Sequence, residues 1–271
     1  MTGPGPRPGL GTWQLGGSTA VTVVGDALRL GYRTIDTAAA YGNEAEVGRA
    51  LAASAVDLEQ ITVITKVWPS DYERVAAAVD ESRLRLGLDV IGTVLLHWPV
   101  PRDFERTVRA FAALLEARER GRLRSAGVSN FLPEHLARLH EAIGVVPEVN
   151  QVELHPYLAG PVRAPRSERL ALQAHSPFGG QVPAGGAPVD DPEIREIAAE
   201  VGATPAQVVL AWLREHGVTA LPKTTSAGRL SENLASTDVV LTAAHMARID
   251  GLDRGARRGP DPREVHDTTF G

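Results

Sequence analysis

Four side chains that hold or transfer protons occur in order along the first hundred residues: Asp36, Tyr41, Lys66 and His97. A free tyrosine has a pKa of about 10, so it gives up its proton reluctantly at neutral pH. A nearby ammonium favours the phenolate, and Lys66 beside Tyr41 would make the phenol a better acid. Asp36 would keep a buried lysine protonated, and His97 would hydrogen-bond the oxygen that receives the proton.

Each of these residues also has an ordinary structural explanation. Asp36 could cap a loop, Tyr41 could be a rim aromatic, and His97 could be a buried core histidine. The lysine count favours a functional role. Lys66 and Lys223 are the only lysines among 28 basic residues, so each is either retained by chance or stands where a compact ammonium is needed.

Short β-branched runs alternate with longer segments of helical period along the whole chain. Strands are expected at residues 10–14, 34–37, 61–67, 91–97, 125–129, 146–153, 170–176 and 218–223. Helices are expected at residues 18–30, 43–53, 72–86, 102–120, 133–142, 191–201, 205–216 and 229–236.

This alternation predicts an α/β fold, a single-domain (β/α)8 TIM barrel over residues 1–271. A doubly wound sheet is the alternative, but the first turn, Gly9-Leu10-Gly11-Thr12, leads to no third glycine. Prolines interrupt the sixth crossover at residues 156–169, and residues 178–188 are expected to form a loop over a site.

In such a barrel the active site lies at the carboxyl ends of the strands. Every expected strand from the second to the eighth ends in a side chain that donates protons or hydrogen bonds. These residues are Asp36, Lys66, His97, Asn130, Gln151, Ser176 and Lys223.

The segments that carry these residues resemble the aldo-keto reductase family, and the match extends over nearly the whole chain. They include Thr34-Ile35-Asp36-Thr37-Ala38, Tyr41-Gly42-Asn43-Glu44, Leu96-His97-Trp98-Pro99, Gly127-Val128-Ser129-Asn130 and Asn150-Gln151-Val152-Glu153. The resemblance implies hydride transfer from NADPH to an aldehyde or ketone, with NADP⁺ as the product. Asp36, Tyr41, Lys66 and His97 would be the catalytic residues, and Tyr41 the general acid.

The resemblance also implies a cofactor site. Ser129, Asn130 and Gln151 would hold the nicotinamide carboxamide, and Ser176 would lie near the pyrophosphate. Lys223 and Arg229, just ahead of a helix, would bind the 2′-phosphate. The full expected set is Thr12, Ser129, Asn130, Gln151, His175, Ser176, Lys223, Thr224, Arg229, Glu232 and Asn233.

The chain departs from the family pattern at three places. His175 stands where the family usually has a larger aromatic residue stacked on the nicotinamide. The sixth crossover is short, and the amino terminus is too short for the hairpin that often closes the barrel bottom.

Three tryptophans resemble the family's substrate pocket: Trp13, Trp68 and Trp98. Barrel packing explains each of them equally well, but together they favour an apolar or aromatic carbonyl substrate. The tail, residues 255–271, carries Arg257 and Arg258 and would contribute to substrate choice if it folds over the pocket.

Composition restricts the remaining possibilities. The chain has no cysteine and a net charge of −5 without a basic face, so we expect no disulfide, no thiolate chemistry and no nucleic-acid partner. No signal peptide or membrane span is expected, which predicts a cytoplasmic protein, and the family favours a monomer. No metal site is expected, because the histidines form no His-Glu-x-x-His pair.

Three other functions fit the sequence less well. A short-chain dehydrogenase would have a lysine four residues after its catalytic tyrosine, and a serine hydrolase would have a Gly-x-Ser-x-Gly elbow; the chain has neither. A non-catalytic NADPH-binding barrel, acting as a sensor or regulatory subunit, remains the alternative, although it would not need all four proton-handling residues.

Overall fold

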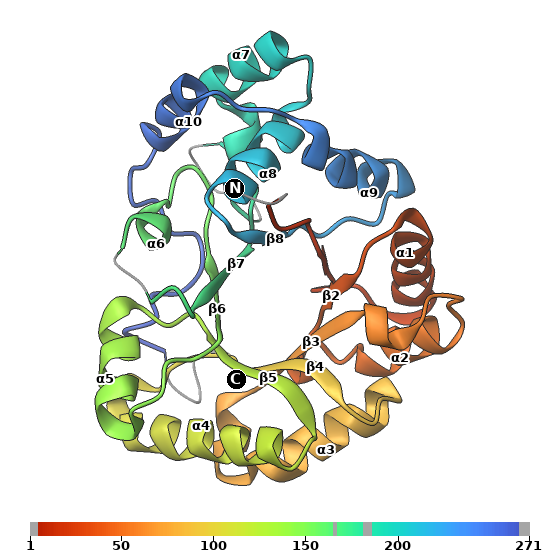
Figure 1. Cartoon of the computed structure of the whole chain (residues 1–271), viewed down its shortest axis with the longest axis vertical. Coiled ribbons are helices and arrows are strands. Elements are labelled where there is room, and N and C mark those ends of the chain that lie inside the picture. The colour runs from red at the N-terminus through yellow and green to blue at the C-terminus, as the bar shows by residue number, and fades with distance from the viewer. Residues whose placement is uncertain (1–4, 165–166, 181–185, 266–271) are drawn as a thin grey trace.

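Eight parallel strands form the centre of the molecule. The computed structural model describes residues 5–164, 167–180 and 186–265. Its strands form one sheet in chain order from β1 to β8, with helices between them. Figure 1 shows the strands as a ring with the helices outside it. The predicted (β/α)8 barrel is therefore confirmed.

The structure fixes the bounds of each element. The strands are β1 Leu10–Gly11, β2 Thr34–Asp36, β3 Thr62–Val67, β4 Ile91–Leu96, β5 Leu123–Ser129, β6 Val149–Glu153, β7 Ala171–His175 and β8 Thr219–Leu221. The helices are α1 Gly17–Leu30, α2 Glu44–Ala52, α3 Val75–Leu86, α4 Phe104–Glu119, α5 Pro133–Ile143, α6 Gly160–Arg163, α7 Pro192–Val201, α8 Pro205–Glu215, α9 Ala227–Leu234 and α10 Ala243–Asp250.

Two glycines bring the first strand next to the last. The backbone N–H of Gly9 donates to the carbonyl of Ala220 at 2.8 Å, and that of Gly11 donates to the carbonyl of Pro222 at 3.0 Å. A Cβ atom at Gly11 would lie 2.9 Å from the backbone oxygen of Leu221, closer than real Cβ contacts. Glycine at these two positions therefore allows the first and last strands to approach each other closely.

The alternation of side chains along a strand decides what reaches the inside of the barrel. On β3, Ile64 packs with Leu95 and Val149 in the barrel interior, whereas Val63 and Val67 join the outer core under the helices. Lys66 lies two residues after Ile64 and therefore points to the same inner side. This short apolar strand thus places the ammonium of Lys66 at the mouth of the barrel.

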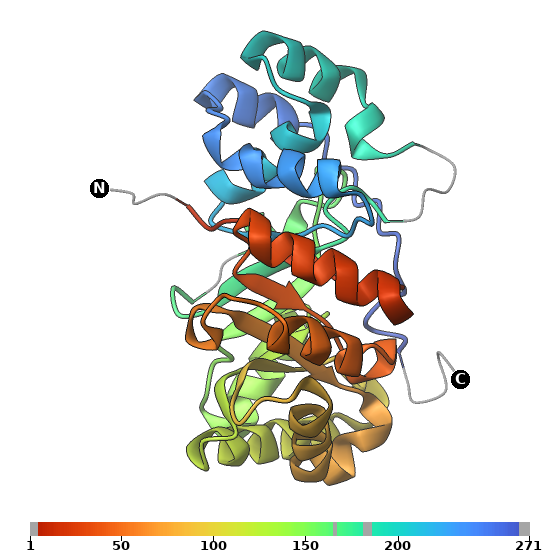
Figure 2. The ribbon, with the colours of Figure 1, turned by 90° about the vertical axis from the view of Figure 1, so that its right-hand side faces the viewer.

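The helices bury the outer face of the sheet in two groups. One apolar core joins α1–α5 and α9 to the first five strands, and the other joins α7, α8 and α10 to β6–β8. Figure 2 shows α7–α10, coloured teal to blue, on one side of α1, and α2–α5 on the other. None of the helices in the described ranges is long and apolar enough to cross a membrane.

The sequence placed the eight strands and most helices correctly but missed α10. This helix has only eight residues, and its main buried side chain is Ile249, so its apolar period is weak. The sixth crossover is short, as expected: α6 is a single turn. Several strands are shorter than expected, because a strand ends where its neighbour stops pairing; β1 pairs with β2 over Leu10 and Gly11 alone.

Some expectations fall outside the described residues. They concern positions 181–185 of the expected loop at 178–188, and positions 266–271 of the tail. Among residues 5–9, no strand or hairpin precedes β1.

Candidate active site

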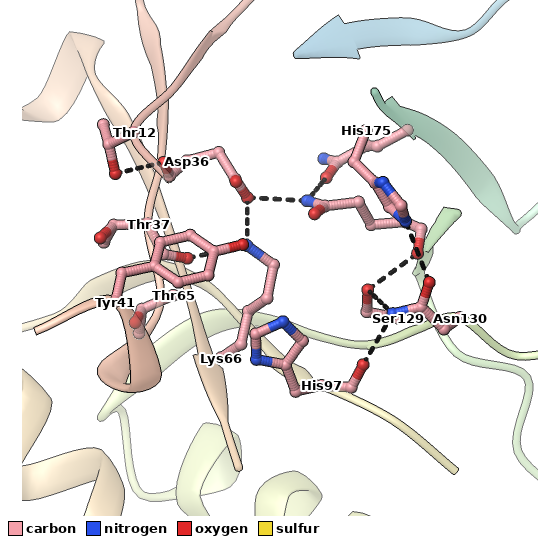
Figure 3. A network of polar contacts seen from close by, with 12 residues as sticks. Thr12, Asp36, Thr37, Tyr41, Thr65, Lys66, His97, Ser129, Asn130 and His175 are labelled. Carbon is pink, nitrogen blue, oxygen red and sulfur yellow. Dashed lines mark hydrogen bonds and ion pairs between the residues drawn. The ribbon is translucent and has the colours of Figure 1, made fainter. Parts of the chain in front are cut away.

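The ammonium of Lys66 connects the predicted catalytic residues. Lys66 and Asp36 are only 1% and 4% exposed. Lys66 Nζ donates to Asp36 Oδ1 at 2.7 Å, to the backbone oxygen of Thr37 at 2.8 Å, and to the hydroxyl of Tyr41 at 3.5 Å. Figure 3 shows this convergence. An acid, its cationic neighbour and the counter-ion therefore form one connected group.

Tyr41 and His97 approach each other at the edge of this group. Tyr41 belongs to a short 3₁₀ helix, Ala39–Tyr41, and His97 directly follows β4. Their ring centroids are 5.8 Å apart, and the indole of Trp68 lies 4.8 Å from the His97 ring. Nδ1 of His97 is buried and has no hydrogen-bond partner among the described residues. A ligand oxygen near both rings would meet a phenol and an imidazole.

Electrostatics keep each group in the form that acid catalysis needs. Burial raises the pKa of Tyr41, and Lys66 offsets only part of this rise, so the phenol is protonated at neutral pH. Burial opposes the charge of Lys66, but Asp36 and Tyr41 raise its pKa above the ordinary value. Burial and the Lys66 charge hold the pKa of His97 well below its ordinary value, so the imidazole is neutral.

Gln151 joins the acid group to the opposite wall of the barrel. Its amide Nε2 donates to Asp36 Oδ1 at 2.7 Å and to Oε1 of Gln173 at 3.1 Å. A glutamine amide has two hydrogens, and these two contacts use both. Gln151 can therefore offer only its carbonyl oxygen to a ligand.

Asn130 and His175 form the second side of the site, as Figure 3 shows. Asn130 Nδ2 donates to the backbone oxygen of His97 at 3.0 Å and to the hydroxyl of Ser129 at 3.2 Å. The His175 ring lies between Asn130 Oδ1, 3.0 Å from Nε2, and Ser176 Oγ, 3.1 Å from Nδ1. Burial lowers the pKa of His175 to about 4, so this ring is also neutral at pH 7.

The expected phosphate site lies at the start of α9. Ser226 caps this helix by accepting from the backbone N–H of Arg229 at 3.3 Å. Lys223 and Arg229 are exposed, and neither forms an ion pair with any residue in the described ranges. Along α9, Glu232 is half-buried and Asn233 is buried. Lys223 precedes the amino terminus of α9 and Arg229 lies in its first turn, so two available cations make this end suitable for a phosphate group.

Comparison with known proteins decides the family. The sequence model of the aldo/keto reductase family matches residues 9–176 and 189–254. This chain belongs to the aldo/keto reductase family.

Individual relatives agree over almost their full lengths. An aldo-keto reductase of Mycolicibacterium smegmatis is 44% identical, over 97% of this chain and 95% of the relative. Morphine 6-dehydrogenase of Pseudomonas putida is 40% identical, over 98% and 93%. The crystal structure of a Gox0644 variant in complex with NADPH matches with a TM-score of 0.87 at 36% identity, over 96% of this chain and 94% of that chain.

The three tryptophans of the predicted substrate pocket differ in their exposure. Trp13 is 51% exposed, Trp68 is half-buried against His97, and Trp98 is 8% exposed. Thr12, expected at the cofactor, is fully buried, and its hydroxyl donates to the backbone oxygen of Asp36 at 2.9 Å. The contact of Thr12 with the cofactor stays a prediction.

Sequence analysis assigned no role to several buried polar residues beside Tyr41. Asn43 and Glu44 follow it directly and are each 1% exposed. Their partners include Thr37 and Thr65, which flank Asp36 and Lys66 in the sequence. Two adjacent polar residues at the start of an otherwise apolar helix face were the available signal. The described residues contain no cluster of three or more side chains arranged to hold a metal ion.

Proposed function

We propose that this chain reduces an aldehyde or ketone to an alcohol with NADPH, and that Tyr41 donates the proton to the carbonyl oxygen. The observation that carries this proposal is the position of the buried Lys66 ammonium, between the Asp36 carboxylate at 2.7 Å and the Tyr41 hydroxyl at 3.5 Å. Membership of the aldo/keto reductase family supports it.

The residues around the carbonyl would act as follows. Tyr41 is protonated at neutral pH and transfers its proton as negative charge develops on the substrate oxygen. Lys66 stabilises the resulting phenolate, and Asp36 keeps Lys66 charged. Neutral His97 retains one ring N–H, which can donate to the same oxygen and fix its position.

The side chains present fit NADPH. Bound NADPH supplies the hydride that reduces the carbonyl carbon. Asn130, Ser129 and Gln151 would hold the carboxamide, and His175 would stack on the ring beside them. The exposed cations Lys223 and Arg229, which have no ion pair within the described ranges, would bind the 2′-phosphate, with Thr224, Ser176, Glu232 and Asn233 along the rest of the cofactor.

The substrate is proposed to be an apolar or aromatic carbonyl compound. Trp68 packs against His97 at 4.8 Å, and exposed Trp13 follows β1 at the same end of the barrel. Together with Trp98 they would form an aromatic wall beside Tyr41. We further propose that residues 1–271 form one domain that acts as a monomer in the cytoplasm, with a small-molecule carbonyl compound as its partner.

The test follows NADPH absorbance with a panel of aromatic and aliphatic aldehydes. Tyr41→Phe should lower turnover by about 10² to 10⁴ while retaining NADPH binding. The control is Tyr32→Phe, which removes a hydroxyl that donates only to Leu230 O, 3.0 Å away, and should keep turnover. Binding of NADPH without turnover in any variant or wild type would instead favour the sensor alternative.

A further inference from the structure

The turn that carries Tyr41 has little packing of its own. Ala39 and Tyr41 of the 3₁₀ helix Ala39–Tyr41 are half-buried, and Ala40 and Gly42 are exposed. The next two residues, Asn43 and Glu44, are by contrast each 1% exposed. The position of Tyr41 must therefore be set largely by the segments that flank its turn.

Asn43 binds the loops on both sides of this turn. Its Nδ2 donates to the backbone oxygens of Thr12 and Leu15, both at 2.8 Å. Its Oδ1 accepts from the hydroxyl of Thr37 at 2.6 Å. Both amide hydrogens and the carbonyl are thus used in contacts that hold the loop after β1 against the loop after β2.

Glu44 binds the neighbouring strand. Its Oε1 accepts from the hydroxyl of Thr65 at 2.5 Å, and its Oε2 accepts from Nε of Arg85 at 2.6 Å. Thr65 immediately precedes Lys66 on β3, so this contact fixes the end of the Tyr41 turn against the strand that carries its cationic partner.

We propose that Asn43 is a positioning residue for the reaction, with Glu44 in support, and that it fixes Tyr41 relative to both Lys66 and Trp13. The proposal rests on the proposed function. In the sequence, Trp13 lies between Thr12 and Leu15, whose carbonyls accept from the Asn43 amide. This amide therefore fixes the positions of both the acid, Tyr41, and the exposed aromatic side chain that would meet the substrate. Displacement of a reacting group by 1 Å costs on the order of 10²-fold in rate.

Two substitutions separate positioning from simple stabilisation. Asn43→Asp has the same size and keeps the acceptor for Thr37, but it loses both donors to the loop after β1. Thr37→Val removes only the hydroxyl that donates to Asn43, without a change of charge. The matched control is Thr107→Val, which removes a buried hydroxyl that accepts from the backbone of Val100 at 3.1 Å, away from the Tyr41 turn.

Turnover, cofactor affinity and the pH profile should be measured together. We expect kcat to fall about 30- to 100-fold in Asn43→Asp and about three- to tenfold in Thr37→Val, with the Kd for NADPH nearly unchanged. The pH profile of kcat should move in both variants, whereas Thr107→Val should match the wild type.

A second readout does not depend on turnover. The ultraviolet titration of Tyr41, obtained by difference from Tyr41→Phe, should shift in Thr37→Val, because the phenol moves relative to Lys66. Unchanged kcat, pH profile and Tyr41 titration in Thr37→Val would overturn the proposal, even with a lower Tm. Absence of turnover in the wild type would instead count against the proposed function, while the Tyr41 titration would still decide whether Asn43 and Thr37 place the phenol.

Discussion

The two ends of the candidate site differ in how completely they are assembled without a ligand. At the acid end, Asp36 and Lys66 are at most 4% exposed and joined at 2.7 Å. At the phosphate end, Lys223 and Arg229 are exposed and form no ion pair among the described residues. The acid end is thus built in advance, whereas the phosphate end presents available charge.

The difference follows from what each end has to do. Proton transfer depends on orientation within fractions of an ångström, so its groups are held by buried hydrogen bonds. Binding of a phosphate depends on charge and a few donors, and flexible exposed cations supply both. Changes at the acid end should therefore alter turnover and stability, and changes at the phosphate end should alter cofactor affinity alone.

The largest effect is expected from Lys66→Met. Turnover should fall about 10²- to 10⁴-fold, because Tyr41 loses the charge that stabilises its phenolate. The free energy of unfolding should fall by about 3 to 5 kcal/mol, because Asp36 is left as an unpaired buried carboxylate. Steady-state kinetics and urea denaturation measure the two effects. Turnover within tenfold of wild type would contradict the role of this ammonium.

A smaller effect, confined to binding, is expected from Arg229→Gln. Loss of one charge-assisted contact should weaken NADPH binding about 10- to 100-fold, with kcat and Tm nearly unchanged. Fluorescence titration should show no loss for NADH, which lacks the 2′-phosphate. The control is Arg120→Gln, which removes an exposed arginine that follows α4 and pairs with Glu116 of the same helix. Equal losses for NADPH and NADH would show that Arg229 does not bind the 2′-phosphate.

The smallest effect concerns His175 and acid. Its folded pKa of about 4 lies below the ordinary value of 6.5, so the unfolded chain takes up the proton first as pH falls. Stability should be full above pH 6.5 and decrease towards pH 4. Thermal melts at pH 7 and pH 5 should therefore show a smaller fall in Tm for His175→Asn than for wild type. Equal falls would mean that the ring titrates normally.

The sequence predicted the strands better than the crossovers. Apolar β-branched runs such as residues 61–67 are enough to predict a buried strand, and the predicted bounds of β3 agree with the structure to within one residue. The helix α10 was not predicted, because eight residues with one well-buried side chain show almost no helical period of apolar residues. The candidate catalytic residues were visible because their chemistry requires particular residue types at strand ends, and the structure brings all four together.

Other contacts were decided only by the closed barrel. Gln151 and Asp36 are 115 residues apart in the sequence, yet their side chains lie 2.7 Å apart across its interior. The bonds of Asn43 to Thr12, Leu15 and Thr37 likewise depend on two loops meeting. The sequence by itself determined the order of the elements and the chemical groups at their ends, because local pattern and residue type suffice for both. Only the tertiary structure decided which hydrogen bonds hold those groups, because a buried polar atom bonds to whatever partner folding brings within 3 Å, however distant in the chain.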